Sequence, residues 1–194
     1  MKICFASHNK NKVKEMNEIM PDGVNIVGLG ELGIIEDIAE TGSTLEENAT
    51  IKSSYVYNKH KLPVFADDSG LIVHALNGEP GVYSARYAGE ERDDQKNMDL
   101  LLKNLDGKTD RSAEFCTVIS YIDEAGKKHE FTGKIEGVII EEKRGNNGFG
   151  YDPIFRPSGF NETFAELSSD VKNRISHRAK AVQKFLEYLH QTNE

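Results

Sequence analysis

The sequence predicts one α/β domain over residues 1–194, built on a mixed β-sheet. Two observations lead to this class. Apolar positions recur with helical spacing in some segments, and alternate or run continuously, as in strands, in others. In addition, Ala113–Ile122 and Lys128–Ile140 are joined by the turn residues Asp123-Glu124-Ala125-Gly126, which is a strong signal for a long antiparallel hairpin. Helices combined with such a hairpin are typical of mixed sheets.

The first third of the chain predicts a strand followed by two helices. Lys2–Ala6 is a short apolar run, as in a buried strand, and Asn11–Met20 places its apolar residues on one helical face. The residues Ser43-Thr44-Leu45-Glu46-Glu47 contain two overlapping capping boxes. They predict a helix over Leu45–His60.

The middle of the chain predicts two buried strands, Pro63–Ala66 and Leu71–Ala75, separated by a turn at Asp67-Asp68-Ser69-Gly70. Besides the hairpin, three segments complete the fold: an amphipathic helix, a structured loop rich in glycine and aromatic residues, and a closing helix. They are expected at Arg92–Leu105, Asn146–Pro157 and Ser176–Leu189.

Composition excludes several classes of protein. A net charge of −8 argues against a nucleic-acid backbone as the main partner, because that binding depends on neutralising phosphates. No apolar run is long enough to span a membrane, and the apolar N-terminal stretch is too short for a signal peptide. The two cysteines, Cys4 and Cys116, lie in strand-like runs and are expected to be buried free thiols. These features favour a cytoplasmic protein.

The turn Ser7-His8-Asn9-Lys10-Asn11-Lys12 connects the first strand to the first helix. Backbone N–H groups and the positive end of the helix dipole meet at such a turn, which makes it a candidate phosphate site. The alternative is a plain polar connection in which Asn9 caps the helix. The turn is not a Walker loop, and Gly107-Lys108-Thr109 lacks the upstream glycines of one.

Asp67 and Asp68 follow an apolar strand, and neighbouring strand residues point to opposite faces, so the two should have different roles. A carboxylate at the end of a strand suits Mg²⁺, which prefers a few carboxylates together with waters and phosphates. The alternative is a turn carrying two solvated acids. Lys52 shares a helical stripe with Ala49 and Val56. It is therefore either directed into a phosphate site or extended outward along its stem.

The segment Asn147–Pro153 combines glycines, which allow close approach to a ligand, with the aromatic rings of Phe149 and Tyr151, on which a base can stack. A tight aromatic turn in the core is the alternative. Ser176-His177-Arg178 lies at an expected helix start, where its donors can meet a base or a phosphate. The alternative there is a pair of basic surface residues.

Six segments in this order together resemble the inosine triphosphate pyrophosphatase family, over almost the whole chain. They are Ser7-x-Asn9-x-x-Lys12, Glu46-x-Asn48-Ala49-x-x-Lys52, Ala66-Asp67-Asp68-Ser69-Gly70-Leu71, Pro80-Gly81-Val82-Tyr83-Ser84-Ala85-Arg86, Phe149-Gly150-Tyr151-Asp152-Pro153 and Ser176-His177-Arg178. The resemblance implies a long twisted mixed sheet flanked by helices, with two lobes around a central cleft. It also implies a homodimer that hydrolyses ITP, dITP and XTP to the monophosphate and pyrophosphate with Mg²⁺, which cleanses the nucleotide pool.

The resemblance also implies the role of each site residue. Asp68 would be the general base and a magnesium ligand, Glu40 a second ligand, and Lys52 a phosphate-contacting catalytic residue. The remaining residues would bind substrate: Ser7, His8, Asn9, Lys10, Asn11 and Lys12 at the phosphates, Ser69 beside the general base, Phe149, Gly150, Tyr151 and Asp152 at the base, and Lys172, His177 and Arg178 at the purine and its 6-oxo group.

Three other functions stay open on the sequence. One is a pyrophosphatase for other modified nucleotides, including pyrimidines. Another is a sensing module that binds a nucleotide without cleaving it. The third, a nucleic-acid-binding domain with aromatic stacking platforms, is disfavoured by the acidic charge balance.

Overall fold

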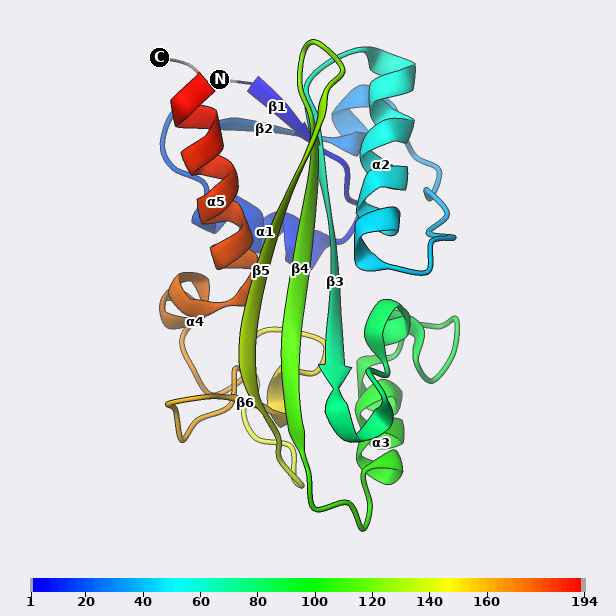
Figure 1. Ribbon diagram of the computed structural model, residues 1–194, viewed down its shortest axis with the longest axis vertical. Helices are drawn as coiled ribbons and strands as arrows, with labels where there is room; N and C mark the ends of the chain where they lie inside the picture. Colours follow the sequence, from blue (N-terminus) through cyan, green and yellow to red (C-terminus); the bar gives the residue numbers. More distant parts are fainter. Residues whose placement is uncertain (1, 193–194) are drawn as a thin grey trace. The chain divides into compact units, whose positions relative to one another are not determined.

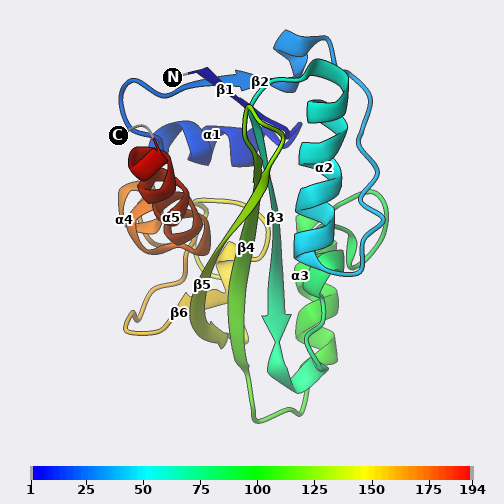
Figure 2. The same cartoon turned by 45° about the horizontal axis from the view of Figure 1, so that its top comes forward.

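The computed structural model describes residues 2–192 and contains a six-stranded sheet with the strand order β2-β1-β3-β4-β5-β6. Strand β1 is parallel to both of its neighbours, whereas β5 and β6 are antiparallel, so the sheet is mixed as predicted. The strands are β1 (Lys2–Phe5), β2 (Asn25–Gly28), β3 (Val64–Val73), β4 (Ser112–Ile122), β5 (Lys128–Ile139) and β6 (Phe155–Pro157). Strands β3, β4 and β5 are the long ones and lie side by side (Figures 1 and 2).

Five α-helices accompany the sheet within the described residues: α1 (Lys10–Ile19), α2 (Leu45–His60), α3 (Asp94–Asn104), α4 (Ser169–Ile175) and α5 (His177–Thr192). Four 3₁₀ helices occur in the connections: η1 (Leu29–Leu32), η2 (His74–Leu76), η3 (Gly81–Arg86) and η4 (Asp152–Ile154). No helix in residues 2–192 combines the length and apolar character that crossing a bilayer requires.

The chain forms two compact units, each made of several chain segments. Unit 1 contains residues 2–68, Thr117–Gly133 and 179–192, and unit 2 contains Ser69–Cys116 and Lys134–Arg178. Strand β3 crosses from one unit to the other between Asp68 and Ser69. The functional residues predicted on this strand are therefore divided between the two units.

Unit 1 has a core on each face of its part of the sheet, because successive strand residues point to opposite sides. Ile3 and Phe5 of β1 pack with residues of α1 and α5, whereas Cys4 and Ala6 lie in a second cluster with Val56 of α2. Helix α2 thus covers one face, and α1 and α5 cover the other (Figure 1). Both cysteines are buried and neither forms a disulfide, as predicted, and burial raises the pKa of Cys4 to about 12.

Unit 2 has a single large core cluster. It joins the apolar stripe of α3 to the end of β3, to β4 and β5, and to the aromatic residues of the segment that leads into β6. Phe115 and Phe155 meet edge to face with centroids 4.6 Å apart. The predicted amphipathic character of α3 is correct, although this helix begins at Asp94 with Asp93 as its cap, because Arg92 has a positive φ of 53°.

Two predicted boundaries are wrong. Asp67-Asp68-Ser69-Gly70 is not a turn between two strands but lies inside the continuous strand β3. Polar side chains do not interrupt a strand when facing residues pair with them, and both aspartates have such lysine partners. The loop expected over Asn146–Pro157 contains η4 and the edge strand β6. Strand β2 and helix α4 were not predicted.

Candidate active site

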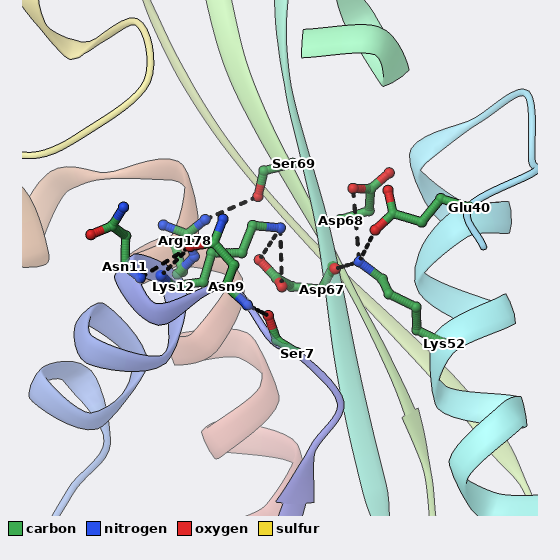
Figure 3. A network of polar contacts seen from close by, with 10 residues as sticks. All are labelled: Ser7, Asn9, Asn11, Lys12, Glu40, Lys52, Asp67, Asp68, Ser69 and Arg178. Carbon is green, nitrogen blue, oxygen red and sulfur yellow. Dashed lines mark hydrogen bonds and ion pairs between the residues drawn. The ribbon is translucent and has the colours of Figure 1, made fainter. Parts of the chain in front are cut away.

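In unit 1, the alternation of side chains along β3 directs Asp67 and Asp68 to different lysines (Figure 3). The Asp67 carboxylate lies 3.2 Å from Lys12 Nζ, and Asp68 Oδ1 lies 4.0 Å from Lys52 Nζ. Both aspartates are buried. The alternative of two solvated acids in a turn is therefore wrong, and the two carboxylates contact different lysine ammonium groups.

Lys52 extends from the buried face of α2, and only 8% of its side chain is exposed. Its Nζ donates hydrogen bonds to Glu40 Oε1 at 2.9 Å and to the carbonyl oxygen of Asp67 at 2.6 Å. Burial alone would lower the pKa of Lys52, but three neighbouring carboxylates outweigh it and raise this pKa above its usual value. Lys52 is thus a buried cation, and the alternative of an outward-extended lysine is wrong.

The carboxyl group of Asp68 has a pKa raised from 3.8 to about 6. Burial is the main cause, because it disfavours the ionised form, and the positive charges of Lys12 and Lys52 offset only part of that effect. A carboxylate that is ionised at neutral pH but accepts a proton close to it is suited to act as a general base.

Glu40 and Asp68 both contact the same Lys52 Nζ, at 2.9 and 4.0 Å. Within residues 2–192, no group of three or more histidine, cysteine, aspartate and glutamate side chains could hold a metal ion. A site closed by protein ligands alone, as for structural zinc, does not fit this arrangement. Two carboxylates fit Mg²⁺, which keeps several waters and binds substrate phosphates.

The predicted phosphate turn is organised mainly as a helix cap. Asn9 Oδ1 accepts hydrogen bonds from the backbone N–H groups of Asn11 and Lys12, at 3.0 and 3.2 Å, and the Asn9 N–H donates to Ser7 Oγ. The capping alternative is therefore correct for Asn9. Residues His8 to Asn11 are exposed, so a ligand here would meet their side chains, among them the ammonium group of Lys10, as well as the helix dipole.

In unit 2, Phe149 lies beside two cationic side chains. Lys172 Nζ is 4.9 Å and the guanidinium carbon of Arg178 is 5.9 Å from the centre of its ring. Both cations are buried, and Arg178 also donates a hydrogen bond to Ser69 Oγ at 3.2 Å (Figure 3). The alternative of basic surface residues is therefore wrong for Arg178. His177 is also buried, with its ring stacked 4.7 Å from that of Phe115.

Tyr151 and Asp152 are held inside the protein rather than presented at its surface. The Tyr151 hydroxyl donates to the Ser84 carbonyl oxygen at 2.7 Å, and its ring belongs to the core of unit 2. Asp152 Oδ2 accepts from Lys172 Nζ at 2.6 Å and from the Phe149 N–H at 3.1 Å. The core alternative is thus correct for Tyr151, whereas Phe149 is only half-buried and can offer part of its ring to a ligand.

Gly148 makes this arrangement possible. It has a φ of +70°, and a Cβ atom added there would lie 2.0 Å from Asp152 Oδ2. The N–H of Gly150, the other predicted glycine, donates to Asp94 Oδ2 on α3 at 2.8 Å. Sequence reasoning gave no role to Ser84 or Asp94. Ser84 lies within the Pro80–Arg86 motif, which was the one signal pointing to it.

These observations define the class of protein: an α/β protein with a mixed sheet, buried lysine–carboxylate pairs in unit 1, and a phenylalanine flanked by two cations in unit 2. The family model described as the Ham1 family matches residues 3–188. The chain is 51% identical to a dITP/XTP pyrophosphatase of Flavobacterium johnsoniae over 189 residues, which cover 97% of this chain and 98% of that protein. It belongs to the Ham1 family.

Other relatives agree with this membership. A Bacillus subtilis protein with the same name, dITP/XTP pyrophosphatase, is 48% identical over 188 residues, and the match covers 95% of both chains. The solved structure of the Staphylococcus aureus Ham1 protein superimposes with a TM-score of 0.90 at 44% identity, over 99% of this chain and all of that one. The predicted fold class, a mixed sheet flanked by helices, is therefore confirmed.

Proposed function

We propose that this protein hydrolyses deaminated purine nucleoside triphosphates (ITP, dITP and XTP) to the monophosphate and pyrophosphate, and so removes them from the nucleotide pool. The observation that carries the proposal is the buried cluster of Lys52 with Glu40, Asp67 and Asp68. Relatives named dITP/XTP pyrophosphatase, about half identical over nearly the full chain, support this substrate class.

In the proposed reaction, Asp68 orients a water molecule and takes its proton while the water oxygen attacks the α-phosphorus. The bond from that phosphorus to the bridging oxygen breaks, and pyrophosphate leaves. Lys12 and Lys52 stabilise negative charge on the phosphate oxygens. Asp67, paired with Lys12, shapes the site rather than attacking. When bound by Glu40 and Asp68, Mg²⁺ would supply further charge neutralisation on the phosphates.

Selectivity would come from the polarity of hydrogen bonds at the base. Hypoxanthine and xanthine carry an acceptor oxygen at position 6, whereas adenine carries a donor amine there. The donors of Arg178 and Lys172, close to the ring of Phe149, would donate to the oxygen, whereas the amine of adenine would present them with another donor. A site built to pair with one such group can reject the wrong partner by ~10⁴ or more.

The test is a pyrophosphate-release assay with ITP, XTP, dUTP and ATP, with Mg²⁺ and with EDTA in its place. We expect rapid release from ITP and XTP, slow release from ATP and dUTP, and loss of activity in EDTA. Nucleotide binding without release would favour the sensing module instead. Full activity in EDTA would remove magnesium from the proposal.

We further propose that the protein acts in the cytoplasm, as its composition favours, and that it is a homodimer, as the family resemblance implies. Light scattering coupled to gel filtration would measure the mass in solution. A mass corresponding to one chain at micromolar concentration would exclude the dimer.

Arg178→Ala should lower kcat/KM for ITP more than kcat/KM for ATP, so the ratio of these two values should fall. The reason is that one lost charged hydrogen bond is worth about 1.5–3 kcal/mol, or roughly 10- to 150-fold. Measuring both substrates on wild type and variant separates two roles for the guanidinium group. If Arg178 contacts the phosphates rather than the base, kcat/KM should fall equally for both substrates. An unchanged ratio of kcat/KM for ITP to that for ATP would therefore contradict base recognition.

A further inference from the structure

Asn48 lies one helical turn before Lys52 on the buried face of α2 and is fully buried. Its Oδ1 accepts a hydrogen bond from the backbone N–H of Gly42 at 2.7 Å. Gly42 follows Glu40 by two residues, and Glu40 is the carboxylate that accepts from Lys52 at 2.9 Å. Asn48 therefore fixes the segment that carries Glu40 to the helix that carries Lys52.

Gly42 approaches α2 so closely that a larger residue does not fit. A Cβ atom at this position would lie 2.6 Å from the Cβ of Glu47 and 2.7 Å from Asn48 Oδ1. Glu47 adds a second attachment, because its Oε2 accepts from the backbone N–H of Ser43 at 2.6 Å and from its hydroxyl at 2.9 Å. The first turn of α2 thus sets the path of the chain just after Glu40.

The amide group of Asn48 is not explained by packing. Its Nδ2 is buried and has no hydrogen-bond partner among residues 2–192. An unsatisfied buried donor costs about 1–3 kcal/mol, so an apolar side chain of similar shape, such as leucine, would pack here at less cost. The feature that leucine cannot supply is the acceptor Oδ1, which accepts from the Gly42 N–H in the segment that carries Glu40.

We propose that Asn48 is a positioning residue for the acidic pair. Through the Glu40-Thr41-Gly42 segment, it keeps the Glu40 carboxylate beside Lys52 and Asp68, where it can act as a metal ligand. This inference rests on the magnesium role given to Glu40 under the proposed function. Groups that orient a metal-binding carboxylate without touching the metal are commonly worth 10- to 100-fold in metal affinity.

The test measures metal binding rather than turnover. Mn²⁺ replaces Mg²⁺, and its free concentration is followed by electron paramagnetic resonance in the presence of a non-hydrolysable ITP analogue. Asn48→Leu, which removes the acceptor but keeps a branched side chain with the same number of heavy atoms, should weaken Mn²⁺ binding by about 10- to 100-fold. Asn48→Asp keeps the acceptor and should retain most of the affinity. Asn58→Leu, the same change on the exposed face of α2, should have no effect.

A double-mutant cycle with Glu40→Gln separates positioning from a general structural role. If Asn48 acts through Glu40, Asn48→Leu should cause little further loss once Glu40 is replaced. Additive losses, or equal losses in the leucine and aspartate variants, would overturn the inference. Gly42→Ala breaks the same contact from the loop side and gives the same test if Asn48→Leu does not fold.

The outcomes also distinguish this inference from the proposed function. Wild-type protein that binds no Mn²⁺ would overturn the metal role of Glu40, and the inference with it. Wild-type protein that binds Mn²⁺, together with an Asn48→Leu variant of unchanged affinity, would overturn the inference alone.

Discussion

Asp68→Asn should abolish most turnover and, at the same time, make the protein more stable at neutral pH. Asparagine keeps the volume but can neither take a proton nor carry the charge. The buried Asp68 carboxyl has a pKa of about 6 instead of 3.8, so its ionisation in the folded protein is unfavourable. A rise of about two pKa units corresponds to roughly 3 kcal/mol of unfolding free energy at pH 8. The asparagine variant avoids this cost.

The gain in unfolding free energy from Asp68→Asn should be larger at high pH than at low pH. Because the folded-state pKa is raised, the protonated carboxyl favours folding below pH 3.8, and this advantage is lost as the pH rises towards 6. The gain from Asp68→Asn should therefore fall from about 3 kcal/mol at pH 8 to about half of that at pH 5. Urea denaturation at the two pH values measures it. Asp67→Asn is the control and should show no gain, because the Asp67 carboxylate pairs directly with Lys12.

A stability gain of equal size at both pH values would mean that packing, and not ionisation, explains the Asp68 effect. Wild-type rates of pyrophosphate release in Asp68→Asn would exclude this residue as the general base.

Lys52→Ala should lower turnover by about 10²–10³, the usual effect of removing one donor that stabilises charge in a transition state. It should also destabilise the protein. Removing one partner of a buried ion pair commonly costs about 3–5 kcal/mol, because it leaves a buried charge uncompensated. Here Glu40 and Asp68 lose their common partner, and the Asp67 carbonyl loses a donor.

The stability loss in Lys52→Ala should be smaller at pH 5 than at pH 8, because the carboxylates can then take up protons. Lys59→Ala provides the matched control at the exposed end of the same helix, where Lys59 pairs with Glu36 in solvent and its loss should change stability little. Unchanged turnover and stability in Lys52→Ala would contradict both roles given to this lysine.

The parts of the fold that the sequence predicted are those determined locally. Helix α2 occurs at Leu45–His60 as expected, because Thr44 Oγ1 caps it by accepting from the Glu47 N–H within the same turn. The hairpin strands β4 and β5 also lie within a residue of their predicted ends. In both cases the decisive interactions join residues that are close in the chain.

The errors arise where distant residues decide the structure. Local sequence at Asp67 and Asp68 favours a turn, but Lys12 and Lys52, far away in the chain, pair with these carboxylates and allow the strand to continue. Strand β2 has four residues, like β1, but only its two central residues, Ile26 and Val27, are apolar, so its own pattern does not identify it. Helix α4 could have been found, since Ser168 caps it by accepting from the Val171 N–H.

In the candidate site, the sequence selected several of the residues but did not predict which contacts they make. The sequence motifs selected Lys52 and Arg178, and both are buried cations that donate hydrogen bonds, Lys52 to Glu40 and Arg178 to Ser69. It could not separate Phe149 from Tyr151, because the difference between them is the Ser84 carbonyl that accepts from the Tyr151 hydroxyl across 67 residues. The role of Asn48 likewise depends on a backbone contact that no spacing rule reports.

The interleaving of chain segments in unit 1 affects how the protein folds while it is synthesised on the ribosome. The core of this unit stacks Phe5 on Phe65 with centroids 4.8 Å apart and places Phe185 5.2 Å from Phe65. Phe5 belongs to β1 and Phe185 to α5, so the core cannot close until the ribosome has synthesised α5. Contacts of such long sequence separation slow folding and leave apolar surface exposed meanwhile. Strand β1 of the nascent chain therefore stays partly exposed to solvent until α5 has been synthesised and packs against it.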